Sequence, residues 1–200
     1  MGPTNFIKIM IFSALLSLPC SVFSDQQEKY DYWKVSLENQ FSWVVYETPG
    51  TYVAGHSFSI VNKFSECSSN NLMLKLSTNK PTVLIETYKD STFQIEFQTK
   101  QDRFNVDLPL LVYKKISPVS EISVLVFTNF IINDNFLNLL NNNNYITVKI
   151  YDNESGLDIK EEKFNLKGFN EARLKAKKMC ISHAKNKLKM AKLNNPRVGY

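Results

Sequence analysis

Two of the three cysteines and both histidines are the residues of this 200-residue chain best suited to nucleophilic or metal chemistry. Cys67 with His56 could form a nucleophile and base, but that chemistry requires a free thiolate. Cys180 and His183 lie one helical turn apart and could share a metal, yet two ligands do not complete a zinc site. The sequence therefore predicts no catalytic residue, no metal site and no cofactor.

The remaining polar residues also lack a recognisable catalytic pattern. The chain has no G-x-S-x-G elbow, no phosphate-binding glycine loop and no H-E-x-x-H. We expect His56 to be a satisfied or exposed surface histidine, and His183 to lie at the border of a basic helix. Glu161 and Glu162 are adjacent on a predicted strand, so their side chains point to opposite faces and are expected to be ordinary solvated charges.

The first 24 residues have the layout of a secretory signal peptide. Lys8 precedes an apolar run from Ile9 to Leu18, and the small residues Val22 and Ser24 suit a cleavage site. The run is too short to cross a hydrocarbon core of about 30 Å as a helix, so no stable membrane span is expected after cleavage. An uncleaved N-terminal anchor is the alternative, and Pro19 before Cys20 fits a lipid-attachment motif poorly.

Export changes what the cysteines predict. Removal of the leader takes Cys20 with it and leaves Cys67 and Cys180 as a pair. Cysteine pairs in exported proteins oxidise, and a bridge across so long a loop is worth about 4–5 kcal/mol in the chain-entropy model. The favoured prediction is a Cys67–Cys180 disulfide.

Charge is distributed unevenly along the chain. The formal net charge is +5, but the segment from residue 169 onward has nine basic residues and one acid, whereas residues 25–168 are net acidic. A basic tail can bind an anionic membrane surface or an acidic partner, or it can be a solvated helix face. Export argues against nucleic acid. The candidate residues for an anionic partner are Lys175, Lys177, Lys178, Lys185, Lys187, Lys189, Lys192 and Arg197.

The body of the chain is dominated by short runs rich in Val, Ile, Phe, Tyr and Thr with period-two alternation, which is typical of strands. The clearest is 93–97, where Phe93, Ile95 and Phe97 share one face. The other predicted strands are 33–37, 41–46, 56–61, 72–76, 82–86, 103–106, 122–130, 145–151 and 160–166.

Two segments have helical patterns instead. Residues 134–140 place four apolar residues within two turns, and Asp134 could cap this helix. Residues 169–193 lack Gly and Pro and are rich in Ala, Lys and Leu, which favour helix. An apolar stripe runs along the second helix at four-residue spacing, through Ala172, Ala176, Cys180, Ala184 and Leu188.

These elements predict an all-β fold, an antiparallel β-sandwich or partly open barrel with a C-terminal α-helix packed on it. The predicted organisation is a signal peptide at 1–24, the β-sandwich domain at 25–168, a basic helix of the same domain at 169–193 and a flexible tail at 194–200.

The end of the chain also carries a resemblance. The stretch from Tyr145 to Cys180 leads through F-x-L-x-G, at Phe164, Leu166 and Gly168, into a helix with spaced alanines and a cysteine. It resembles the invasion-associated locus B family and related uncharacterised periplasmic proteins. The resemblance covers the C-terminal part only and implies a small all-β domain with a periplasmic or outer-surface accessory role, without active-site residues to carry over.

Together these patterns predict an exported, non-enzymatic binding or accessory protein of the bacterial envelope, periplasmic or secreted. Its partner would be an envelope protein or an anionic surface, and the oligomeric state is left open. The alternative is a secreted or periplasmic hydrolase with an unrecognised site, using His56 and nearby acids.

Overall fold

The computed structural model describes residues 27–115, 123–151, 159 and 161–194. Its helices are a single 3₁₀ turn at Asn39–Phe41, α1 at Thr82–Thr87, α2 at Asp134–Asn142 and α3 at Phe169–Asn194. The strands formed by these described residues are β1 Gln27–Tyr30, β2 Trp33–Glu38, β3 Trp43–Pro49, β4 Ser57–Lys63, β5 Glu66–Thr78, β6 Thr92–Gln98, β7 Arg103–Lys115, β8 Ser123–Ile131, β9 Tyr145–Tyr151 and β10 Glu161–Asn165.

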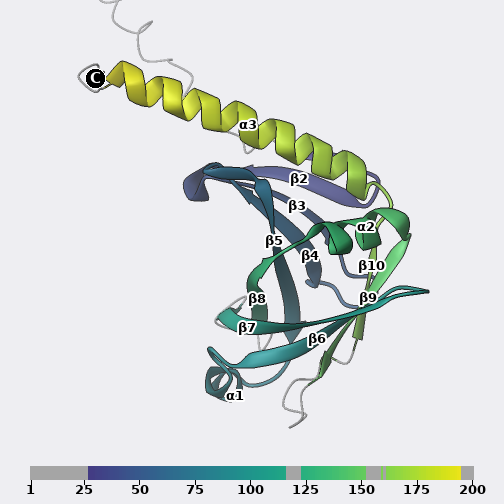
Figure 1. Ribbon diagram of the computed structural model, residues 1–200. Coiled ribbons are helices and arrows are strands. Elements are labelled where there is room, and N and C mark those ends of the chain that lie inside the picture. The colour runs from purple at the N-terminus through teal and green to yellow at the C-terminus, as the bar shows by residue number, and fades with distance from the viewer. Residues whose placement is uncertain (1–26, 116–122, 152–158, 160, 195–200) are drawn as a thin grey trace, which may run out of the picture.

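All strand pairings are antiparallel and run in the order β1-β2-β3-β4-β5-β8-β7-β6-β9-β10. The sheet curls on itself, so that β10 returns to the end of β3 (Figure 1). A bridge between Gly50 and Phe164 joins the two there, and the Thr51 N–H donates to the Lys163 carbonyl at 2.9 Å. The expected all-β fold, a sandwich or partly open barrel with a C-terminal helix, is confirmed.

Aromatic side chains fill the space between the curled sheet and α3. Trp33 is fully buried, with ring centroids 5.9 Å from Tyr46, 6.1 Å from Phe58 and 5.1 Å from Phe169. Such tilted and edge-on pairs add to the free energy gained from burying apolar area. Phe169 is the first residue of α3, so this cluster fixes the start of the helix to β2 and β3.

Gly168 makes the connection into α3 possible. Its φ is +88°, in the left-handed region that residues with a side chain rarely adopt. A Cβ atom at this position would collide with the Tyr30 carbonyl oxygen of β1. The Gly168 carbonyl then accepts the Ala172 N–H at 3.0 Å, which opens the helix.

The apolar stripe predicted along α3 is covered by the sheet only in its first half. Ala172, Ala176 and Cys180 are buried, Ala184 is half-buried and Leu188 is 64% exposed. Met179 completes the buried face. Figure 1 shows why, since α3 crosses β2 and β3 and its C-terminal half extends past the edge of the sheet.

Two local predictions were wrong. The predicted strand 82–86 is the helix α1, because the Pro81 carbonyl accepts the N–H groups of Leu84 and Ile85 and begins a helical turn. A strand would have placed Val83 and Ile85 on one face, but Val83 is exposed and Ile85 is buried. Helix α2 is capped by Asn133, whose side chain accepts the Phe136 N–H at 3.0 Å, and not by Asp134.

Candidate functional site

The cysteine pair is joined as predicted. Cys67 and Cys180 form a disulfide, with their Cα atoms 5.6 Å apart. The bond links the start of β5 to the middle of α3. Since it occupies the Cys180 sulfur, Cys180 and His183 do not form a metal-binding pair, and the described residues contain no group of three His, Cys, Asp or Glu suited to a metal. His183 is half-buried and stacks on Phe64, with ring centroids 5.9 Å apart.

A buried carboxylate occupies the seam between β10 and the loop after β3. The Glu162 side chain is completely buried, and its two oxygens accept four backbone N–H groups at 2.8–3.0 Å. Three of these donors are consecutive loop residues, and the fourth is the next residue of β10: Thr51, Tyr52, Val53 and Lys163. The loop therefore forms a cradle around the carboxylate.

His56 closes this cradle from the other side. Its Nδ1 lies 2.7 Å from Glu162 Oε2, and its Nε2 lies 3.0 Å from the Ser77 carbonyl oxygen. Burial works to raise the pKa of the Glu162 carboxyl, but hydrogen bonds from Tyr52, Lys163, His56 and Val53 outweigh it and lower that pKa. Both ring nitrogens of His56 are therefore engaged, one by the carboxylate and one by a backbone carbonyl.

The seam allows no side chain at Gly50. A Cβ atom there would lie 2.7 Å from the Glu162 carboxyl carbon and 2.8 Å from the His56 Cβ. The His56–Glu162 hydrogen bond is thus an internal contact that fastens the loop to β10. The expectation of a satisfied histidine is right, but His56 is only 3% exposed and does not lie on the surface. Glu162 is likewise not a solvated charge, whereas Glu161 is exposed and pairs with Lys149 at 3.7 Å.

The lysines proposed for an anionic partner fall into two groups. Lys175 pairs with Glu28 at 2.6 Å, which raises the pKa of the lysine, and Lys187 donates to the Ser42 hydroxyl at 2.8 Å. The other described ones are exposed and have no ion pair within the described part of the chain: Lys177, Lys178, Lys185 and Lys189. The Lys192 side chain and all of Arg197 lie outside the described residues.

An exposed apolar line accompanies these lysines. Leu174, Ile181 and Leu188 are spaced seven residues apart, so they form one ridge on the side of α3 that faces away from the sheet. We call these three residues the outer ridge. Sequence reasoning followed only the four-residue stripe of the sheet-facing side and did not predict the outer ridge.

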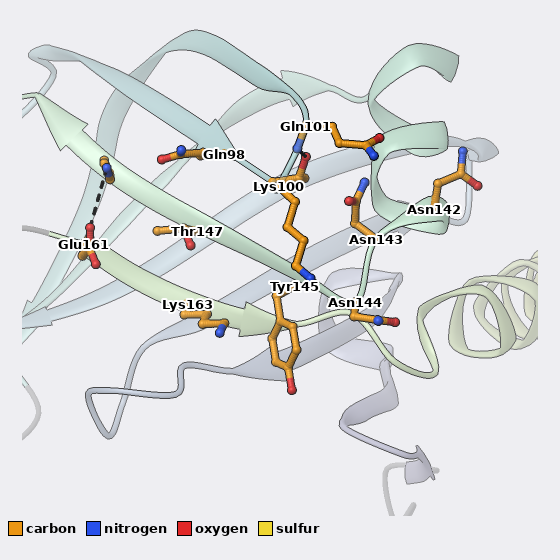
Figure 2. A pocket seen from close by; sticks show the side chains of 12 residues that line it. Gln98, Lys100, Gln101, Asn142, Asn143, Asn144, Tyr145, Thr147, Glu161 and Lys163 are labelled. Atoms are coloured by element: carbon orange, nitrogen blue, oxygen red, sulfur yellow. Dashed lines mark hydrogen bonds and ion pairs between the residues drawn. The ribbon is translucent and has the colours of Figure 1, made fainter.

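A second surface feature was not predicted at all. A hollow of about 700 Å³ lies over the outer face of β9 and β10, bounded by the β6–β7 turn and the end of α2 (Figure 2). We call it the polar trough, because amide, hydroxyl and charged side chains dominate it. The residues that line it are Gln98, Thr99, Lys100, Gln101, Asn142, Asn143, Asn144, Tyr145, Thr147, Lys149, Glu161 and Lys163.

The geometry defines a disulfide-bonded, partly open antiparallel β-barrel with a basic C-terminal helix, and among the described residues no catalytic constellation. In structure the chain is similar to invasion-associated protein B from Bartonella henselae, with a TM-score of 0.50 and 11% sequence identity. The match covers 76% of this chain and 95% of the other. At that identity the likeness is one of fold. No protein-family model matches the chain, and no curated protein is similar to it in sequence.

Among the described residues, no helix combines the length and the hydropathy that crossing a bilayer requires.

Proposed function

We propose that this protein is an exported, non-enzymatic accessory protein of the bacterial envelope, and that it binds an acidic protein partner through the outer face of α3. The observation that carries the proposal is the outer ridge, which presents Leu174, Ile181 and Leu188 to solvent. Exposed aliphatic residues at seven-residue spacing supply one of the two apolar positions of a heptad, a narrow face on which a second helix can lie.

The positive charge of the lysines beside the outer ridge indicates which kind of partner would bind there. Lys177, Lys178, Lys185 and Lys189 flank the outer ridge, so a second copy of α3 would bring lysines against lysines. An amphipathic helix with acidic flanks would instead pair with them. The ridge carries no Trp, Tyr or Phe, which interfacial membrane helices use as anchors. These features favour an acidic helix over a lipid surface.

Export is supported by the leader-like residues 1–24 and by the disulfide, because such bonds persist in oxidising compartments. A hydrolase centred on His56 has less support. Both ring nitrogens of His56 are engaged and the residue is buried, so it cannot take a proton from a substrate.

The test is affinity capture from envelope extracts under native salt, followed by titration of each captured protein. A double variant, Ile181→Asp with Leu188→Asp, removes the ridge, and Lys178→Glu with Lys185→Glu reverses the flanking charge. Val83→Asp with Lys89→Glu is the matched control, because both residues are exposed on or just after α1, away from α3. We expect both α3 variants to lose an acidic partner that wild type and the control retain.

Vesicles of phosphatidylglycerol and phosphatidylethanolamine form the second arm of this experiment. Tight binding of the wild-type protein to these vesicles, abolished by the Lys178→Glu and Lys185→Glu changes, would overturn the proposal in favour of a membrane surface. Turnover of a cell-wall or lipid substrate by the purified protein would also overturn it.

A further inference from the structure

The polar trough differs from the amide clusters elsewhere in the fold. On β4 and β5, asparagine side chains are used internally, with Asn62 donating to the Ser69 carbonyl at 2.7 Å and Asn71 to the Val61 carbonyl at 3.4 Å. In the trough, the side chains of Gln98, Gln101 and Asn142 have no hydrogen-bond partner among the described residues. The trough thus presents free amides that the fold itself does not use.

Exposed amide side chains also lie beyond the polar trough. A second depression of about 390 Å³ shares Gln101, Asn142 and Asn143 with the trough and extends along α2 past Asn138 and Asn135. The exposed amides Asn135, Asn138 and Asn142 are spaced three and four residues apart, so they lie along one side of α2. The combined surface suits an elongated ligand.

Hydrogen-bond chemistry narrows the class of ligand. An amide side chain offers both donors and an acceptor, and a sugar hydroxyl likewise donates and accepts, so the two match along an extended chain. Thr147 adds a free hydroxyl from β9, and Tyr145 is a 44% exposed aromatic ring at the trough edge (Figure 2). Few apolar side chains line the trough, which disfavours a lipid or another hydrophobic ligand.

The charges of the trough are mostly engaged within the protein. Lys149 pairs with Glu161 at 3.7 Å, and the Lys163 ammonium lies 4.1 Å from the centre of the Tyr145 ring. Lys100 is exposed, points into the trough and has no ion pair within the described residues (Figure 2). One free cation among neutral donors and acceptors fits a ligand that carries hydroxyls together with an anionic group.

An extended peptide is a poorer fit. Peptides commonly bind by adding a strand to a free sheet edge. The edge nearest the trough is β10, and Gly50 and Thr51 already pair with it, at Phe164 and Lys163. A ligand can therefore contact the outer face of β10 but cannot pair with its edge in the way that an added strand would.

We propose that the polar trough is a binding site for an acidic oligosaccharide, with the amides of α2 and of the β6–β7 turn binding its hydroxyls and Lys100 its carboxylate. The site is separate from the outer face of α3, so it does not depend on the function proposed above.

The test is a titration of the ¹⁵N-labelled protein with oligogalacturonate hexamer and with its neutral counterpart, maltohexaose. We expect the acidic sugar to shift the amide resonances of residues 98–101 and 142–147. Lys100→Gln and Asn142→Ala should each weaken its binding about tenfold, as expected for losing hydrogen bonds to a charged ligand. Both substitutions are at exposed positions, so folding is preserved.

Matched controls are available on the same elements. Gln94→Ala changes an exposed amide of β6 outside the trough, and Lys89→Gln removes an exposed cation elsewhere; both should bind like wild type. The proposal is overturned if neither sugar shifts trough resonances at millimolar concentration, if maltohexaose binds as tightly as the acidic hexamer, or if the two control changes weaken binding as much as Lys100→Gln. The α3 variants described above should leave sugar binding unchanged even if they lose the protein partner.

Discussion

His56 and Glu162 are 106 residues apart in the chain and form a buried hydrogen-bonded pair, with 2.7 Å between Nδ1 and Oε2. The pair joins the loop after β3 to β10, where the last strand of the curled sheet returns to the end of β3. A buried charge without its partner is costly, so the closure of the barrel depends on both residues being present.

Glu162→Gln tests that dependence. The amide keeps one acceptor for the loop N–H groups but turns an NH₂ group toward other donors and removes the negative charge beside His56. We expect the free energy of unfolding to fall by about 3 kcal/mol, measured by urea denaturation. Glu161→Gln is the control, because that carboxylate is exposed and its single ion pair is worth about 1 kcal/mol or less. Equal losses in the two variants would contradict the assignment.

The same carboxylate gives the stability a definite pH dependence. The pKa of Glu162 is lowered from its usual value of 4.5 on folding, so the native state binds this proton more weakly than the unfolded chain. The stabilising contribution is complete above pH 4.5 and is lost as the pH falls through the lower, folded pKa. The urea midpoints of wild type and Glu162→Gln should therefore differ most at neutral pH and converge in acid. A constant difference between pH 3 and 7 would contradict this.

Removal of the disulfide should be strongly destabilising. The bond closes a loop with a sequence separation of 113, for which the chain-entropy model gives about 4–5 kcal/mol. The double variant Cys67→Ala with Cys180→Ala should lose that much, and reduced wild type should match it in urea denaturation. Intact mass spectrometry of the unreduced protein should show a mass lower by two hydrogens than that of the reduced protein. Two alkylatable thiols in the unreduced protein would refute the pairing.

Gly168→Ala should weaken the attachment of α3. The added Cβ would combine a left-handed backbone with a collision against the Tyr30 carbonyl oxygen. We expect a loss of at least about 2 kcal/mol, read as a drop in Tm by circular dichroism. Lys167→Ala, one residue earlier at an exposed side chain, should change Tm little. A stable Gly168→Ala protein would mean that β1 can move away from the helix start.

The sequence predicted the sheet well where burial alternates along a strand. Phe93, Ile95 and Phe97 are all buried, as the pattern of 93–97 implied, because one face of β6 lies against the core. The segment 82–86 was misassigned because a short apolar, β-branched run fits either a strand or a helix, and here the turn started by Pro81 decided the outcome.

The candidate sites were harder to predict, since each depends on contacts between distant segments. Nothing near Glu162 in the sequence shows that residues 51–53 will surround it, so a buried carboxylate looked like a surface one. The polar trough combines the β6–β7 turn, the end of α2 and the faces of β9 and β10. Three members of the asparagine run 141–144 line that trough, a position that their composition alone does not indicate. Only the disulfide followed from chemistry alone, because the predicted removal of residues 1–24 would leave two cysteines.

The position of the disulfide determines how α3 carries mechanical load. Tension applied by a partner to the projecting end of the helix would reach Cys180 before it reached the residues that pack on the sheet. The covalent bond would then pass the force to the start of β5, at the centre of the strand order, rather than peel Met179 and Ala176 from β2 and β3. Because α3 is covalently attached near its midpoint, a pull on its free end would not detach it from the barrel.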